Sequence, residues 1–178
     1  HVRSRRQRQM CIRDRPIIAA INGPAAGLGL ILSMWCDMRF ASKSAVFSTA
    51  FSKRGLIAEH GMSWLLPRLV GIGHAMDMTL TARKISADEA EKIGFVNKTF
   101  SDEVFLKEVY KYAESLANEV SPRSMKIMKK QLWQSLLQGL DEAVSIADND
   151  MVDSFSSEDF KEGVSHFIEK RAPNFTGK

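Results

Sequence analysis

The clearest chemical feature of the sequence is a glycine-containing loop between an apolar run and an apolar helix. Residues 17–21 are long enough for one buried strand, and Gly27-Leu28-Gly29 leads into a helix that is expected to end near Trp35. The first backbone N–H groups of a helix have no partner within the helix and attract negative charge. Glycine lets another molecule approach the backbone closely. The loop could therefore hold an anion, or an oxygen that becomes negative during a reaction.

The same loop also has a purely structural interpretation, because strand–glycine–helix connections are common in α/β proteins. The spacing GPAAGLG, from Gly23 to Gly29, matches neither G-x-G-x-x-G nor a phosphate-binding loop that ends in Lys-Ser/Thr. Binding of a nucleotide or dinucleotide phosphate is therefore disfavoured. On the residues alone, an oxyanion site and an ordinary connection both stay open.

Glu59 is a second residue with chemical potential, in the polar segment AEHG ahead of a helical segment that starts at Met62. A carboxylate can take a proton from one carbon atom and return it to another. It can also simply lie in the first turn of the next helix, where the helix dipole favours it. His60 could tune the carboxylate, although an exposed or structural histidine is commoner. The histidines and cysteines show no metal-ligand spacing, so no metal is expected.

The elements around these residues predict an α/β core followed by a helical tail. Strands are expected at 38–41, 45–48 and 95–100, and helices at 62–70, 74–81 and 87–93. The segment 51–57 is expected to be a loop or an irregular strand. Four tail helices are expected at 102–118, from Ser121-Pro122 to Gly139, at 141–155 and at 157–170. The apolar residues of the tail could pack on the core or face another subunit.

Length and composition indicate an ordinary globular chain without a membrane partner. The 178 residues are 44% hydrophobic and 26% charged, and no apolar run approaches the roughly 18 residues that a membrane-spanning helix needs. Two cysteines give no disulfide framework, which favours a reducing, cytoplasmic location.

Positive charge is concentrated at the beginning of the chain. Residues 1–15 hold six arginines and one acid, a net charge of +5, whereas the whole chain has +4 and the remainder therefore −1. The abrupt change at Pro16, and the similarity of MCIRDR to translated sequencing-adaptor read-through, indicate a non-native leader; a disordered basic arm and a transit peptide are the alternatives. Because the remainder is nearly neutral, no nucleic-acid partner is expected.

Four motifs in order resemble the crotonase (enoyl-CoA hydratase/isomerase) family: PIIAAINGPAAGLGLILSMWCDMRFAS, FSKRGLIAEHGMSWLLPRLVG, LTARKISADEAEKIGFVNKTF and GVSHFIEKRAPNF. The resemblance covers about residues 16–175. It implies an α/β fold, a ClpP-type spiral of ββα units with a C-terminal helical trimerisation region. We accordingly divide the chain into a leader at 1–15, a partial crotonase core at 16–118 and a helical region at 119–178.

The resemblance also implies the substrate class and the assembly. Acyl-CoA thioesters would be the substrates, with coenzyme A as part of the substrate and no separate cofactor. The chain would form a homotrimer or a dimer of trimers. Leu28 would supply one backbone N–H of an oxyanion hole, flanked by substrate-binding Ala25, Gly27 and Gly29. The second N–H of this hole lies well upstream in the family, so the chain is expected to be an N-terminally truncated member.

The same resemblance assigns the acid–base chemistry to Glu59. Hydratases of the family carry two carboxylates at the positions of Ile31 and Phe51, which here can only line the substrate. Glu59 matches the single acid of the family's isomerases and dehalogenases. We expect Ile31, Phe51 and Ile57 to give this carboxylate apolar surroundings. Double-bond isomerisation is therefore favoured. Hydration by Glu59 alone with an ordered water, and an inactive chain that only binds acyl-CoA, are the alternatives.

The remaining assignments concern the ends of the substrate and the tryptophans. Phe155 and Lys170 match family residues that reach the adenosine part of CoA, typically from a neighbouring subunit. Lys170 could instead be a solvated residue at a helix end. Trp35 and Trp64 are expected in the core rather than as acyl-pocket walls, and Asp37 is expected to make a structural hydrogen bond.

Overall fold

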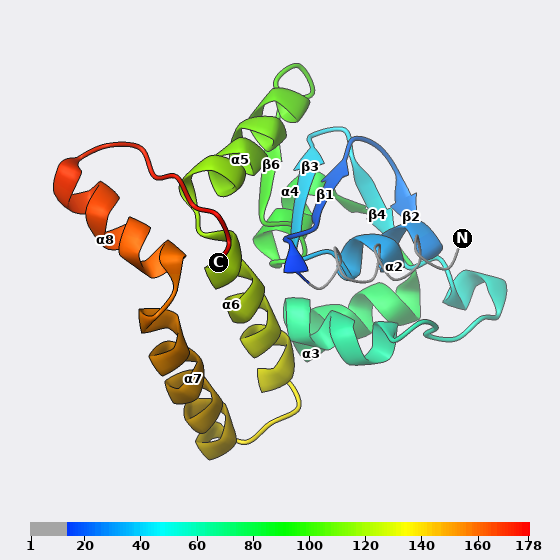
Figure 1. Ribbon diagram of the computed structural model, residues 1–178. Helices are drawn as coiled ribbons and strands as arrows, with labels where there is room; N and C mark the ends of the chain where they lie inside the picture. Colours follow the sequence, from blue (N-terminus) through cyan, green and yellow to red (C-terminus); the bar gives the residue numbers. More distant parts are fainter. Residues whose placement is uncertain (1–13) are drawn as a thin grey trace, which may run out of the picture. The chain divides into compact units, whose positions relative to one another are not determined.

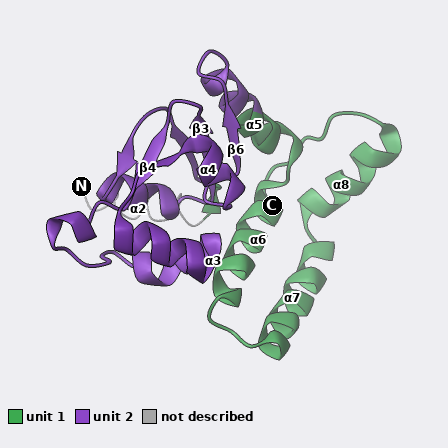
Figure 2. Cartoon of the chain, turned by 180° about the vertical axis from the view of Figure 1, so that it is seen from behind, with its two compact units in different colours: residues 1–16, 112–178 green, residues 17–111 purple. Residues whose placement is uncertain are grey.

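The computed structural model describes residues 14–178 and divides them into two compact units (Figure 2). Ile17–Lys111 form the core unit, and Tyr112–Lys178 with the described residues up to Pro16 form the helical unit. The predicted leader, apart from Asp14 and Arg15, lies outside the described residues. No helix within residues 14–178 is both long and apolar enough to cross a membrane.

The core unit is built from ββα repeats (Figure 1). The first comprises β1 (Ile18–Ile21), β2 (Ala25–Ala26) and α2 (Leu28–Met34), and the second comprises β3 (Met38–Ser42), β4 (Val46–Ser48) and α3 (Met62–Thr81). The first strands of the repeats pair in parallel, with Ile18 opposite Met38, and the second strands pair in parallel, with Ala25 opposite Phe47. Each repeat therefore adds one strand to each of two sheets, which is the predicted spiral.

A third, more irregular repeat completes the two sheets. It comprises β5 (Ile85–Ser86), α4 (Ala87–Lys92) and β6 (Lys98–Phe100). β5 pairs antiparallel with β4, and β6 pairs parallel with β3. Ser86 caps α4, since the Glu89 N–H donates to Ser86 Oγ at 3.2 Å, while the Glu89 carboxylate accepts from Arg83. The buried side chains from all three repeats form the core; the largest are Phe47, Phe95, Leu30, Met34, Met62 and Leu66.

The structure agrees with some of the predicted elements and changes others. The two helices expected at 62–70 and 74–81 are the two parts of α3, which is broken by a non-helical Gly71, where φ is 77° and ψ is 158°. Pro67 lies inside the first part. The segment 51–57 contains a short 3₁₀ turn, η1 (Ser52–Arg54), and the strand expected at 95–100 is confined to its last three residues.

Helices make up almost all of the helical unit. After α5 (Phe105–Glu119), whose first part belongs to the core unit, come α6 (Pro122–Ser135), α7 (Leu140–Phe155) and α8 (Glu158–Glu169). Ser121 caps α6 as predicted by accepting the Ser124 N–H at 3.1 Å. Helix α6 ends at Ser135, four residues before Gly139, which instead precedes α7. Large apolar side chains are exposed on α6, α7 and α8 and on the turn between α6 and α7, among them Leu132, Leu137, Leu140 and Phe167.

Candidate active site

The glycine loop has the geometry of an open helix N-terminus. Gly27 has φ 54° and ψ −119°, in the region that favours glycine, and its N–H donates to the Ser48 carbonyl at 3.1 Å. The first intrahelical bond of α2 runs from the Ile31 N–H to the Gly27 carbonyl, also at 3.1 Å. The N–H groups of Leu28 and Gly29 precede this bond, and both residues are exposed. The loop can therefore present backbone donors to a ligand oxygen.

Strand β4 and the end of α3 hold the loop in place. Ser48 accepts the Gly27 N–H through its carbonyl and donates through its hydroxyl to the Ala82 carbonyl at 3.0 Å. The Thr49 hydroxyl donates to the Met78 carbonyl at 2.8 Å, and Thr49 is fully buried. These hydroxyls satisfy carbonyl groups at the C-terminal end of α3, which would otherwise lack partners. The glycine loop is thus fixed to the packed core of the unit.

The residues expected to line the substrate differ in burial. Ala25, Ile31 and Phe51 are buried, and only 3% of Ile31 is exposed. Ile57, which we expected beside the carboxylate, is 77% exposed. The chain after Phe51 folds back through η1, where the Leu56 N–H donates to the Phe51 carbonyl at 3.1 Å. This turn directs residues 56 and 57 outward, which no local sequence pattern indicated.

Glu59 lies on a sharply turned segment just ahead of α3. Its side chain is 37% exposed, and His60 Nε2 lies 3.7 Å from Glu59 Oε2. The next two residues, His60 at φ 51° and Gly61 at φ 79°, are both left-handed. The Glu59 carbonyl accepts the Met62 N–H at 2.9 Å, which closes the turn. A left-handed residue with a side chain is unusual and is held by its surroundings, often at functional sites.

Trp35 joins this turn to α2. The Trp35 indole N–H donates to the His60 carbonyl at 3.1 Å. A Cβ atom added to Gly61 would come within 2.9 Å of the Trp35 ring, so the ring packs directly on the glycine. Trp35 is 43% exposed and Trp64 is partly buried, so the expectation that both are core residues is wrong for Trp35. Through this contact the structure brings the helix that begins at Leu28 and the segment that carries Glu59 together.

Two polar residues support the first strands of both repeats. The Ile17 N–H donates to Asp37 Oδ2 at 2.7 Å, which confirms the predicted hydrogen-bonding role of Asp37. Sequence reasoning missed the buried Arg39, whose guanidinium donates to the carbonyls of Phe95 at 2.6 Å and Cys36 at 2.8 Å. Burial lowers the pKa of Arg39 from its ordinary value. An arginine in a strand gives no local signal that distant carbonyl groups will surround it.

Phe155 and Lys170 lie in the helical unit. Phe155 is exposed on α7, and its ring meets the Phe160 ring edge to face at 5.3 Å. Lys170 follows α8 in a left-handed conformation, φ 52°, with an exposed side chain. The next residue, Arg171, pairs with Glu162 and holds the pKa of that carboxyl at about 2.

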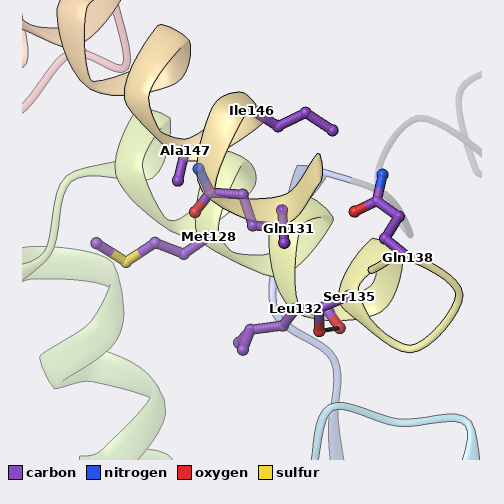
Figure 3. A pocket seen from close by; sticks show the side chains of 8 residues that line it. Met128, Gln131, Leu132, Ser135, Gln138, Ile146 and Ala147 are labelled. Carbon is purple, nitrogen blue, oxygen red and sulfur yellow. Dashed lines mark hydrogen bonds between the residues drawn. The ribbon is translucent and has the colours of Figure 1, made fainter. Parts of the chain in front are cut away.

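The helical unit also contains a pocket of about 350 Å³ between α6 and α7 (Figure 3). Met128, Leu132 and Ile146 contribute apolar side chains to its lining, and Gln131 and Gln138 contribute polar ones. None of the predicted site residues lines it. Within residues 14–178, no group of three or more His, Cys, Asp or Glu side chains is placed to hold a metal ion.

Comparison with known proteins identifies the family. The family model described as enoyl-CoA hydratase/isomerase matches residues 4–178. The chain belongs to this family. A solved enoyl-CoA hydratase from Bacillus anthracis superimposes on the whole chain with a TM-score of 0.89 at 29% identity, and 72% of that chain is covered. The predicted crotonase fold is therefore confirmed.

Curated proteins from several bacteria resemble the chain in sequence. The 1,2-epoxyphenylacetyl-CoA isomerase of Escherichia coli is 34% identical over 171 residues, which are 96% of this chain and 65% of the relative. The crotonyl-CoA hydratase of Syntrophomonas wolfei is 38% identical over 165 residues, 93% of this chain and 63% of the relative. The chain thus spans about three fifths to two thirds of the length of the curated relatives that it matches.

Proposed function

We propose that the protein acts on acyl-CoA thioesters and moves a double bond through proton transfer by Glu59. Leu28 supplies a backbone N–H to the thioester oxygen, at the open start of α2. Family membership, and the exposed residues Leu28 and Gly29 ahead of the first intrahelical bond of α2, support the first part of this proposal. The single observation that carries the second part is the placement of Glu59 on a partly exposed turn, while Ile31 and Phe51 are buried apolar residues.

The reaction balances with one carboxylate. Glu59 takes a proton from C2 of a 3-enoyl thioester, and the electrons of that C–H bond move into the thioester carbonyl to give an enolate. The Leu28 N–H stabilises the oxygen as its negative charge develops. The protonated Glu59 then returns the proton to C4, and a conjugated 2-enoyl thioester forms. The CoA group stays attached through the thioester bond, leaves as part of the product and does not take part in proton transfer.

A pair of substrates tests the proposal in the full-length gene product. Isomerisation of a 3-enoyl-CoA creates the absorbance of a conjugated thioester, and Glu59→Gln is expected to abolish this signal while acyl-CoA binding is retained. Glu114→Gln changes an exposed acid on α5 and serves as the matched control. Wild-type turnover by the Glu59→Gln variant would exclude Glu59 from the mechanism.

Hydration of a 2-enoyl-CoA is the second candidate function. The Glu59 side chain is 37% exposed, so a water molecule can reach the carboxylate. Hydration would destroy the conjugated absorbance of a 2-enoyl-CoA, whereas isomerisation creates it from a 3-enoyl-CoA. Loss of the 2-enoyl signal without activity on the 3-enoyl substrate would replace isomerisation by hydration. Binding without turnover of either substrate would support a non-catalytic acyl-CoA-binding chain.

We also propose that the protein assembles as a homotrimer or a dimer of trimers and that Phe155 and Lys170 contact the adenosine part of CoA. The exposed apolar side chains of α6–α8 favour burial against another subunit. Light scattering tests the assembly. A lost charged contact would raise KM for acyl-CoA about 10-fold in Lys170→Met, but not KM for the matching acyl-pantetheine. Lys161→Met is the exposed control on α8, and equal effects on both substrates would contradict the assignment.

A further inference from the structure

The side chain of Trp35 links α2, which carries the proposed oxyanion N–H of Leu28, to the turn that carries Glu59. Trp35 immediately follows α2, and its own backbone N–H still bonds to the Ile31 carbonyl at 3.3 Å. Its side chain therefore starts from the helix itself. The indole N–H then reaches the carbonyl of His60, the residue after Glu59, at 3.1 Å. A direct hydrogen bond thus links two segments that are 25 residues apart in the sequence.

The indole ring makes a second contact with the same turn. Gly61 has no Cβ, and the Trp35 ring lies so close that an added Cβ would be 2.9 Å from Cζ2. Real Cβ atoms essentially never come this close to another heavy atom. The ring therefore uses the space that the glycine leaves. Trp35 thus makes a hydrogen bond to His60 and a packing contact with the next residue, Gly61.

The turn needs such support because its conformation is disfavoured and little else covers it. His60 is left-handed at φ 51°, although it has a Cβ. Leu56 and Ile57, which lead into the turn, are exposed. A disfavoured backbone conformation persists only where the surroundings impose it. Trp35 supplies contacts of this kind from a helix that is itself anchored by buried Leu30, Ile31 and Met34.

We propose that Trp35 is a positioning residue that fixes the Glu59 carboxylate relative to the oxyanion N–H of Leu28. Leu28 and Trp35 stand at the two ends of α2, about 10 Å apart along the helix axis. The helix is short and packed, so it acts as a rigid spacer between the two groups. This inference rests on the proposed function, in which Glu59 must reach both C2 and C4 while the Leu28 N–H holds the thioester oxygen.

Positioning predicts an effect on the chemical step rather than on binding. Misplacing a reacting group by about 1 Å can lower the rate about 100-fold. Trp35→Phe keeps a ring against Gly61 but removes the donor to His60, so its kcat should fall about 10-fold. Trp35→Ala removes both contacts and should lower kcat about 100-fold. In both variants the Kd for an unreactive saturated acyl-CoA should stay within about twofold, because neither variant changes the Leu28 N–H.

The experiment compares these variants in the full-length gene product with 3-enoyl-CoA as substrate. Gly61→Ala adds a Cβ atom where the Trp35 ring packs on Gly61, so it disturbs the same contact and should also lower kcat. Trp64→Phe is the matched control: this partly buried tryptophan lies on α3 and stacks with Arg68, whose Cζ is 4.1 Å from the ring centroid. Its kcat should be unchanged. Thermal melting is recorded for every variant, so that loss of fold is separated from loss of positioning.

The outcomes separate this inference from the function on which it rests. Reduced kcat in folded Trp35→Phe, with unchanged Kd and an unaffected Trp64→Phe, supports positioning. Wild-type kcat in Trp35→Phe, a rise in KM alone, or an equal loss in Trp64→Phe overturns it. Wild-type turnover in Glu59→Gln overturns the proposed function itself. An inactive Glu59→Gln variant beside a fully active Trp35→Phe variant overturns only the positioning role.

Discussion

The buried carboxylate of Asp159 should determine whether the C-terminal segment stays attached to the helical unit. Asp159 is 4% exposed. Its Oδ2 accepts the Ser121 hydroxyl at 2.5 Å, and its Oδ1 accepts the N–H groups of Thr176 and Gly177, each at 2.9 Å. The carboxylate therefore joins the start of α6, the first turn of α8 and the last residues of the chain.

Replacement of Asp159 by asparagine keeps the shape of the side chain and removes its charge. An asparagine oxygen can still accept the two N–H groups, but its amide must face Ser121 Oγ, which already accepts the Ser124 N–H. A hydrogen bond to a charged group contributes roughly 1 kcal/mol more than a neutral one, and the exposed end of the chain can regain water. We therefore expect Asp159→Asn to lower the free energy of unfolding by about 2 kcal/mol and Asp159→Ala by about 3 kcal/mol.

The effect should also depend on pH. Burial raises the pKa of Asp159, but the hydrogen bonds from Ser121, Gly177 and Thr176 outweigh it and hold the pKa below its ordinary value of 3.8. For a lowered carboxyl pKa, the stabilisation is complete above the ordinary value and is lost as pH falls through the folded-state value. The difference between wild type and Asp159→Asn should therefore be full at pH 7 and shrink below about pH 4.

Urea unfolding at pH 7 and at pH 3 measures both expectations, with hydrogen exchange at the Thr176 and Gly177 amides as a local readout. Asp153→Asn changes an exposed acid on α7 and is the matched control. A loss below about 0.5 kcal/mol in Asp159→Ala, or a difference from wild type that is equally large at pH 3, would refute the reasoning.

Three more predictions concern single residues. Gly71→Ala should destabilise the protein by about 1–2 kcal/mol because φ there is 77°, whereas Gly73→Ala in the same helix should be neutral or slightly stabilising; thermal melts compare them. Arg171→Met should raise the pKa of Glu162 from about 2 toward the usual carboxyl range, which NMR titration of the carboxyl group would show. The protein should then begin to lose stability at a higher pH as the solution is acidified. Arg39→Met should cost about 3 kcal/mol in urea unfolding, because buried carbonyl groups lose their donors.

Local patterns were enough to predict the features whose cause lies within a few residues. The glycine loop that opens α2 and the cap at Ser121 depend on neighbouring backbone groups, and the structure contains both. These two features need no knowledge of which distant segments meet. The spiral of ββα units was instead implied by the resemblance to the crotonase family, and the comparison with solved structures confirms it.

Features that depend on distant contacts could not be predicted in this way. Trp35 is an apolar residue at a helix end, and its bond to His60 exists only because the chain returns after 25 residues. Arg39 lies in a strand, yet its guanidinium is buried among carbonyl groups from two other segments. Ile57 belongs to an apolar sequence but faces outward because η1 turns the chain. In each case tertiary packing overrides the local pattern.

In the proposed mechanism, the position of Glu59 explains why its turn needs support from another segment. A carboxylate at the place of Ile31 would lie in a side-chain environment that is 3% exposed, where an unpaired charge is costly. Glu59 avoids that cost because 37% of its side chain is exposed. The same exposure means that its turn gains little from burial and cannot hold a left-handed His60 by itself. In the proposed mechanism the single acid lies on a partly exposed turn, and the ring of Trp35, carried at the end of α2, contacts the two residues that follow this acid.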